Sequence, residues 1–163
     1  MKSAQEPDQA SARSRKPAEE TIGWREWVEL PQLGIAQIKA KVDTGARTSA
    51  IHAFELVTEE RQDGVWVRFG MHPDQRSEEN VIWCEAPVKD SRTVRDSGGH
   101  EEERLVIETC VRLGNREWPI EATLTSRDNM GFRMLLGRTA IRGYYAVDPG
   151  RSYLIGKRKR KRA

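Results

Sequence analysis

The stretch KVDTGARTSAIHA, residues 41–53, decides the fold that we expect for this chain. Its Asp-Thr-Gly triplet, residues 43–45, follows a run in which apolar and polar side chains alternate. One face of that run carries Ala36, Ile38, Ala40 and Val42, and the other carries Gln37, Lys39 and Lys41. Period-two alternation predicts a half-buried strand that ends at Asp43. The triplet alone also fits an ordinary turn, because Asp, Thr and Gly are all frequent in turns.

The charges of the chain are unevenly placed. The 163 residues, enough for one domain with a core, include 28 Lys and Arg against 25 Asp and Glu. Six of the basic residues form the tail 157–162, and residues 1–20 carry equal numbers of each sign. The basic balance therefore comes from the tail, and a positive face across the whole domain is not indicated.

Three regions follow from composition. Residues 1–20 are polar and predict a disordered N-terminal extension without a signal peptide. Residues 21–156 form the expected domain, and residues 157–163 form a basic tail. The chain lacks a long apolar run, and its two cysteines, Cys84 and Cys110, lack CxxC spacing. We expect a cytoplasmic protein without membrane contact, with both cysteines as buried structural thiols.

Short strand signals dominate the remaining sequence. Alternating or apolar runs predict strands at 65–69, 104–113, 117–124, 133–137, 144–149 and 152–156. Gly114-Asn115 predicts a tight hairpin turn, and Pro119 an edge or bulged position in the second arm. Residues 138–143 allow one or two helical turns, while 71–103 reads as polar and turn-rich, interrupted by VIWCEAPV. The expected class is mostly β, a small barrel or sandwich.

A second motif changes how the triplet is interpreted. Leu135-Leu136-Gly137 follows Asp-Thr-Gly-Ala, residues 43–46, by roughly 90 positions and precedes the helix signal. This pair resembles the retropepsin-like aspartic peptidases, where an apolar-apolar-Gly segment packs beside the Asp-Thr-Gly loop. The resemblance spans about residues 22–156 and implies a closed β-barrel with one short helix, a single lobe that dimerises.

The resemblance is closest to one bacterial branch of that group. The stretches 23–55, 96–125 and 130–141 look like proteins labelled "ATP-dependent zinc proteases", which are associated with RimK-type ATP-grasp ligases that add glutamates to protein tails. The sequence supports neither part of that label. Its histidines are His52, His72 and His100, HExxH is absent, and so is a Gly-rich phosphate loop. We therefore expect no cofactor and no metal ligands.

The resemblance implies an aspartic endopeptidase. Asp43, Thr44 and Gly45 would be catalytic, with water activated between Asp43 carboxylates of two copies in a homodimer. Thr44 would brace the two loops across the axis, and Gly45 would let the backbone pass close. Two other interpretations stay open. One is a catalytically silent peptide-binding module on the same fold, and the other is a ribosome- or RNA-associated protein that uses the basic tail.

Further residues are expected near the peptide substrate. Ala46 and Arg47 would bind it, as would Gly98 and Gly99 at the tip of a flap, although Ser97 to Gly99 also fit a surface loop. Leu135, Leu136, Gly137 and Arg138 would support the site.

Arg47 stands where the resembling enzymes usually carry an acid, and so two guanidiniums would lie near each other. Either Asp128, Glu26 or Glu29 neutralises Arg138, or Arg47 stays free to bind a substrate carboxylate. The second alternative predicts a preference for acidic or glutamate-rich protein tails. The basic tail is either a solvated end or a weak contact for a polyanion.

Overall fold

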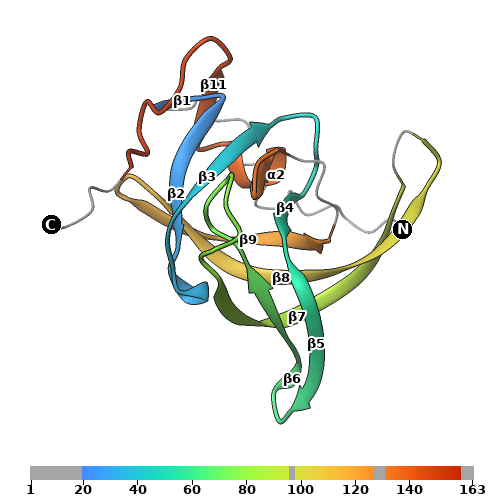
Figure 1. Ribbon diagram of the computed structural model, residues 1–163. Coiled ribbons are helices and arrows are strands. Elements are labelled where there is room, and N and C mark those ends of the chain that lie inside the picture. Colours follow the sequence, from blue (N-terminus) through green and yellow to red (C-terminus); the bar gives the residue numbers. More distant parts are fainter. Residues whose placement is uncertain (1–19, 96–97, 127–130, 159–163) are drawn as a thin grey trace, which may run out of the picture.

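The computed structural model describes residues 20–95, 98–126 and 131–158, and most of this part is β-strand (Figure 1). Its helical segments are the 3-10 turn η1 (Pro31–Leu33) and the one-turn helix α2 (Arg138–Ile141). The strands are β1 (Glu20–Gly23), β2 (Arg25–Leu30), β3 (Ile35–Asp43), β4 (Ser49–His52), β5 (Phe54–Arg61), β6 (Gly64–Met71), β7 (Ile82–Arg95), β8 (Glu101–Leu113), β9 (Arg116–Thr125), β10 (Met134–Gly137) and β11 (Tyr145–Asp148). The predicted N-terminal extension lies outside the described residues apart from Glu20, as does the tail beyond Arg158.

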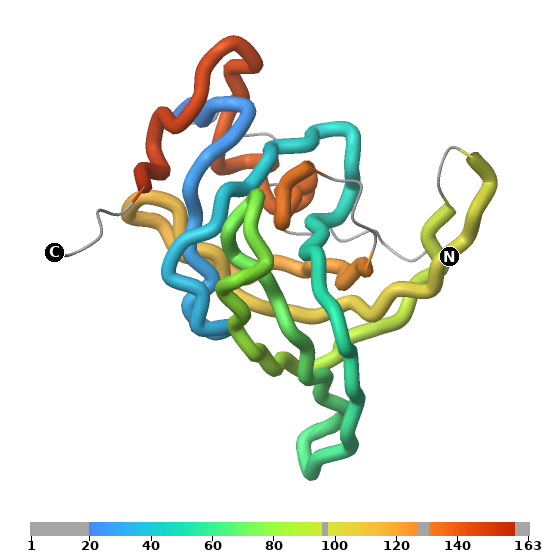
Figure 2. The backbone as a smooth tube through the Cα atoms, viewed as in Figure 1, coloured from blue at the N-terminus to red at the C-terminus, as the bar shows by residue number. Residues whose placement is uncertain are grey.

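Nine strands form one sheet, in the order β2-β3-β10-β4-β9-β8-β7-β6-β5. Strand β2 also meets β8, with Glu29 opposite Arg112, so the sheet curls into a ring that Figure 2 traces. β1 and β11 form a separate parallel pair. The prediction of a mostly β, retropepsin-like fold with one short helix is confirmed.

Strand β3 has the predicted position but not the whole predicted alternation. Ile38, Ala40 and Val42 are buried, whereas Ala36 is exposed and Ile35 is buried instead. The pairing with β2 shifts register between Val28 and Leu30. This bulge adds a residue on β3 and reverses the inward and outward phase beyond it. The prediction for Ala36 is therefore wrong.

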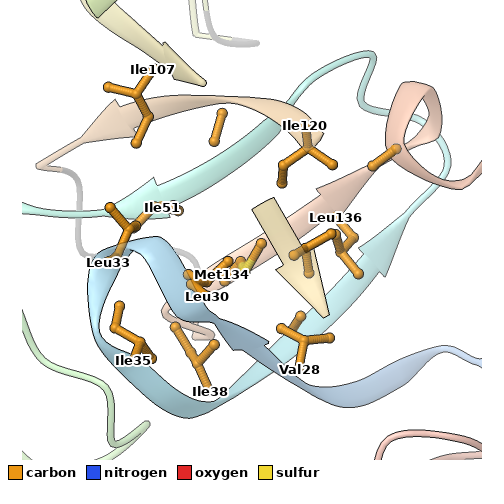
Figure 3. Packing of buried hydrophobic residues seen from close by; sticks show 14 of the residues in the cluster. Val28, Leu30, Leu33, Ile35, Ile38, Ile51, Ile107, Ile120, Met134 and Leu136 are labelled. Atoms are coloured by element: carbon orange, nitrogen blue, oxygen red, sulfur yellow. The ribbon is translucent and has the colours of Figure 1, made fainter. Parts of the chain in front are cut away.

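The core fills the inside of the ring. Figure 3 shows side chains from β2, β3, β4, β8, β9 and β10 converging on one another. Ile35, Ile38, Ile51 and Met134 have no exposed surface at all. Each fully buried aliphatic side chain of this size contributes about 1.5–3 kcal/mol to folding. The same strands that build this core also carry the Asp-Thr-Gly loop.

The predicted hairpin at Gly114-Asn115 is confirmed, because β8 and β9 pair with Leu113 opposite Arg116. Gly114 has a φ of 61°, the left-handed conformation that such turns require. Pro119 lies opposite Cys110 of β8, in the part of β9 before its pairing with β4 begins at Ala122. That side of Pro119 has no neighbouring strand in the described sheet, as its missing N–H demands.

Two predictions about local structure are wrong. The segment 71–103 is not mostly turns, because residues 82–95 form the long strand β7. Residues 152–156 are not a strand. Their backbone is held by the buried carboxylate of Glu26, which accepts hydrogen bonds from the amides of Leu154, Ile155 and Gly156 at 2.7 to 3.1 Å. The Glu26 carboxylate oxygens accept the backbone amides that would otherwise bond to the carbonyl groups of a neighbouring strand.

Candidate active site

Strand β10 inserts between β3 and β4 and brings together the two sequence motifs. It runs parallel to β3, where Gly137 pairs with Asp43 and Leu136 with Val42. It runs antiparallel to β4, where Leu135 pairs with Ala50. The expected packing of the apolar-apolar-Gly segment beside the Asp-Thr-Gly loop is therefore present in the structure.

The Asp-Thr-Gly triplet is a turn as well as a strand end. The carboxylate Oδ1 of Asp43 accepts the amide of Gly45 at 3.1 Å, and the carbonyl of Asp43 accepts the amide of Ala46 at 3.1 Å. An Asp side chain that bonds to the backbone two residues ahead fixes its own orientation. One carboxylate oxygen is thus held by the loop, and the other has no hydrogen bond within the described part of the chain.

Gly137 is required by the close approach of two backbone segments. A Cβ atom at this position would lie 2.6 Å from the carbonyl carbon of Thr48, well inside van der Waals contact. The Gly137 amide donates to the hydroxyl of Ser49 at 3.0 Å. The Ser49 carbonyl in turn accepts from the Thr123 hydroxyl at 3.4 Å. The loop is thereby tied to β10 on one side and to β9 on the other.

Arg138 and Thr139 support the loop through its carbonyl groups. The Arg138 guanidinium donates to the carbonyl oxygens of Gly45 at 3.2 Å and Thr44 at 3.5 Å, and its amide donates to Ala46 at 2.8 Å. The Thr139 hydroxyl donates to the carbonyl of Arg47 at 2.8 Å. Thr139 was not predicted as a site residue. Its position directly after Arg138, at the start of the predicted helix, is the sequence feature that could have indicated it.

The proposed neutralisation of Arg138 by Glu26 or Glu29 is wrong. Glu26 is buried and accepts backbone amides, and Glu29 forms an ion pair with Arg112 at 3.2 Å. The third candidate, Asp128, lies outside the described residues. Within the described residues, Arg138 is instead bonded to neutral carbonyl groups and has no carboxylate partner.

The loop faces outward from the ring. Thr44, Gly45, Arg47 and Arg138 are exposed, while Asp43 is half-buried. Within residues 20–95, 98–126 and 131–158, the Thr44 hydroxyl and the Arg47 guanidinium make no hydrogen bond or ion pair of their own. A polar loop of this kind, rigid in its backbone and open at its side chains, is suited to contacts with another molecule.

The predicted flap residues lie at the end of the β7–β8 hairpin, which extends beyond the ring in Figure 1. Arg95 pairs with Glu101, so Gly98 and Gly99 fall between the arms, and Gly99 has a φ of 84°. Ser97 lies outside the described residues. A hairpin tip is therefore present at this position, and its closure over a substrate stays a prediction.

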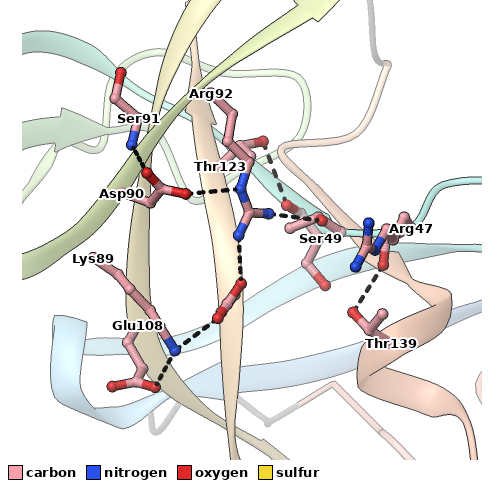
Figure 4. Close-up of polar contacts among 11 residues, drawn as sticks. Arg47, Ser49, Lys89, Asp90, Ser91, Arg92, Glu108, Thr123 and Thr139 are labelled. Carbon is pink, nitrogen blue, oxygen red and sulfur yellow. Dashed lines mark hydrogen bonds and ion pairs between the residues drawn. The ribbon is translucent and has the colours of Figure 1, made fainter. Parts of the chain in front are cut away.

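An ionic network joins this hairpin to the Asp43 loop (Figure 4). Arg92 of β7 contacts Asp90 at 3.2 Å, Glu121 of β9 at 3.1 Å and the Thr48 hydroxyl at 3.5 Å. Hydrogen bonds from Lys89 and then from Arg92 lower the pKa of the Glu121 carboxyl. Glu121 thus stays ionised and ties the β7 arm, through Lys89 and Arg92, to β9.

The histidines do not fit a zinc site. His52 contacts Arg133 at 3.3 Å, and His72 stacks on Phe54 with ring centroids 4.6 Å apart. Among the described residues, no three His, Cys, Asp or Glu side chains are grouped so that they could hold a metal ion. Asp43 is not part of any such group.

The two cysteines are both free thiols. Cys84 is buried in β7, and burial raises the pKa of its thiol to about 11. Cys110 in β8 is only half-buried, so the prediction of a buried thiol holds for Cys84 and is wrong for Cys110. Neither lies in the Asp43 loop.

The ring-like sheet, with an Asp-Thr-Gly loop beside an inserted Leu-Leu-Gly strand, defines a retropepsin-like domain. The family described as "RimB-like: Retropepsin-like aspartic endopeptidase RimB" matches residues 21–158. The chain therefore belongs to the RimB-like family. A crystal structure of Lpg0085, a protein of unknown function from Legionella pneumophila, has the same fold. Its TM-score is 0.70 at 24% identity, covering 84% of this chain and 98% of that one.

Curated relatives carry a different name. Proteins called "Probable alpha-L-glutamate ligase" from Shewanella pealeana and Parasynechococcus marenigrum are 45% and 48% identical to this chain. The matches cover 84% and 83% of the chain but only 30% and 29% of the relatives' length.

None of the helical segments in the described part of the chain has the length and apolar character of a membrane span.

Proposed function

We propose that this chain is an aspartic endopeptidase that works as a homodimer. The observation that carries the proposal is the placement of Asp43. Its strand is fixed against Gly137, its loop is braced by Arg138 and Thr139, and its surroundings are exposed. One chain supplies one such carboxylate. A second copy, related to the first by a two-fold axis beside the loop, supplies the other. The Thr44 hydroxyl, which has no hydrogen bond within the described residues, is then available to bond across that axis.

The chemistry follows from two carboxylates held close together. Like charges about 3 Å apart cannot both ionise, so the pair shares one proton. The ionised Asp43 takes a proton from a water molecule, which attacks the peptide carbonyl. The protonated Asp43 of the other copy donates to the carbonyl oxygen, and the amine leaves after a further proton transfer. This mechanism has no step for the zinc of the "ATP-dependent zinc protease" label, because no group of His, Cys, Asp or Glu in the described part of the chain fits a zinc site.

The proposed substrates are acidic or glutamate-rich protein tails. Arg47 is exposed beside Asp43, and no described carboxylate pairs with it. A free guanidinium binds carboxylates as a charge-assisted, often bidentate pair. The names of the curated relatives favour the same substrates, because an alpha-L-glutamate ligase would produce them. A peptidase that shortens such tails would act in opposition to a ligase that extends them.

The test compares wild type with Asp43→Asn, which keeps the size of the side chain and removes the shared proton. Peptide turnover should fall by several orders of magnitude. Circular dichroism and sedimentation should show the same fold and the same dimer. EDTA should leave wild-type turnover unchanged. Loss of wild-type turnover in EDTA, with turnover remaining in Asp43→Asn, would refute the proposal.

A further inference from the structure

A second feature lies apart from the Asp43 loop, on the outer side of β2 and β3. It is a hollow of ≈ 1090 Å³, bordered by Trp24, Trp27, Lys39 and Arg76 among others. Small-molecule pockets usually have about 300–1,000 Å³, so this volume suits a short stretch of another chain. Neither Asp43 nor its loop borders it.

The charge of the hollow is one-sided. Its border includes the cations Arg25, Lys39, Arg76 and Arg158 against a single carboxylate, Asp74. Arg25 donates to the Ser152 hydroxyl at 3.1 Å, and Lys39 to the amide oxygen of Gln75 at 2.7 Å. These partners are neutral, and none of the four cations has a carboxylate partner in the described structure. Four uncompensated cations around one hollow attract an anionic chain.

Aromatic rings hold several of these cations in place. The Arg25 guanidinium lies 4.6 Å from the centre of the Trp24 ring and 5.0 Å from that of Tyr153. Lys39 and Arg158 lie 5.4 and 5.7 Å from the Trp27 ring. A cation on a ring face keeps N–H groups for an outside acceptor and loses little freedom when it binds one.

The same rings are poorly suited to nucleic acid. Single-stranded RNA binds proteins by stacking bases on open aromatic faces. Here Trp27 is stacked on Tyr153 with centroids 6.1 Å apart and also carries Lys39 and Arg158. Cations already occupy the faces that bases would need. Carboxylates need only the N–H groups, so the arrangement favours an acidic peptide.

We propose that this hollow is a docking groove for an acidic peptide segment, separate from the site at Asp43. The proposal deepens the proposed function, since one long acidic tail would be held here and cleaved elsewhere. Arg158 is followed by four more basic residues in the sequence, which would add to the attraction for a long polyanion.

The test measures binding of a fluorescent deca-glutamate peptide to the full chain by anisotropy at low salt. All proteins carry Asp43→Asn, so that binding is read without cleavage. Adding Lys39→Gln and Arg76→Gln should weaken binding about tenfold or more, as for loss of charged hydrogen bonds. The control, Arg61→Gln with Arg68→Gln, removes the same charge from outside the groove, at two arginines that pair with Glu59 and Glu85, and should change binding less than about twofold.

Equal binding by the groove and control variants overturns the proposal. So does tighter binding of deca-uridylate than of deca-glutamate through the same two residues. Arg76→Gln alone, in the loop before β7, replaces the double variant if that one does not fold. Because Asp43→Asn is common to all arms, a chain that never cleaves peptides can still support or refute the groove.

Discussion

The guanidinium of Arg138 donates a hydrogen bond to the carbonyl oxygen of Gly45, 3.2 Å away. The two residues are 93 positions apart in the chain, yet they form one unit at the loop. A cation on the carbonyl groups of a turn fixes its backbone without touching its side chains. Asp43 is therefore positioned through the backbone of its loop, and its second carboxylate oxygen has no hydrogen bond among the described residues.

Gly137→Ala tests the close approach of β10 to the chain after the loop. The added methyl would meet the Thr48 backbone at 2.6 Å, and backbone does not yield as a side-chain tip would. We expect unfolding in urea to show a loss of about 3 kcal/mol, the upper part of the range for overpacking. Gly150→Ala is the control, since its nearest contact is an ordinary 3.5 Å. Equal stability of both variants would contradict the contact.

Arg47→Ala tests the preference for acidic substrates. The variant should lose about 1–3 kcal/mol of transition-state stabilisation, measured as kcat/KM, on short glutamate-rich peptides. Neutral peptides of the same length should lose much less. Arg68→Ala, an exposed arginine on β6, is the matched control. Equal losses on both kinds of peptide, with the fold intact, would assign Arg47 to loop structure or to dimer contacts.

Glu26→Gln tests the buried carboxylate. Four backbone amides donate to it, from Gly23, Leu154, Ile155 and Gly156. A glutamine would turn an NH₂ group toward some of these donors and leave them unpaired, which should lower stability by about 3 kcal/mol or more. Glu117→Gln, on the exposed surface beside Arg112, should stay within about 1 kcal/mol of wild type. Denaturant unfolding would decide, and similar effects would disprove the role of Glu26.

The thiols give a prediction that depends on pH. Burial raises the pKa of Cys84 to about 11 from an ordinary 9.0, so ionisation favours the unfolded chain. The stability from this group is complete below pH 9 and is lost as the pH rises toward 11. Cys84→Ala should flatten that decline in an unfolding series.

Cys110 should react first with thiol reagents, and the double alanine variant should keep its turnover. An inactive but folded double variant would indicate thiol chemistry.

The sequence predicted those parts of the site that depend on local pattern. The strand before Asp43, the Leu-Leu-Gly strand and the hairpin at Gly114 all carry strong signals of period or turn chemistry. The exposure of Ala36 could not be predicted in the same way, because its bulge exists only in the pairing with β2. Strand β7 was missed because the part of a hairpin that projects from the body exposes both faces and loses its alternation.

The sequence around Glu26 carries a pattern that indicates its burial. In REWVEL it shares its phase with Val28 and Leu30, and all three are buried. A carboxylate in the inward phase of a strand indicates a buried acceptor that needs several donors. Three of the four donors, Leu154, Ile155 and Gly156, lie about 130 positions away, where no sequence pattern marks them.

The insertion of β10 between β3 and β4 has a consequence for how the protein is made. Glu26 contacts Gly156 across 130 positions, and Arg138 contacts Thr44 across 94. A nascent chain that ends before β10 leaves β3 and β4 with unpaired edges, which are prone to aggregation. Folding of this domain must wait until β10 and the chain up to Gly156 have been made and, with so many distant pairings, will be slow. A protein built this way has no finished Asp43 loop until β10 has been translated.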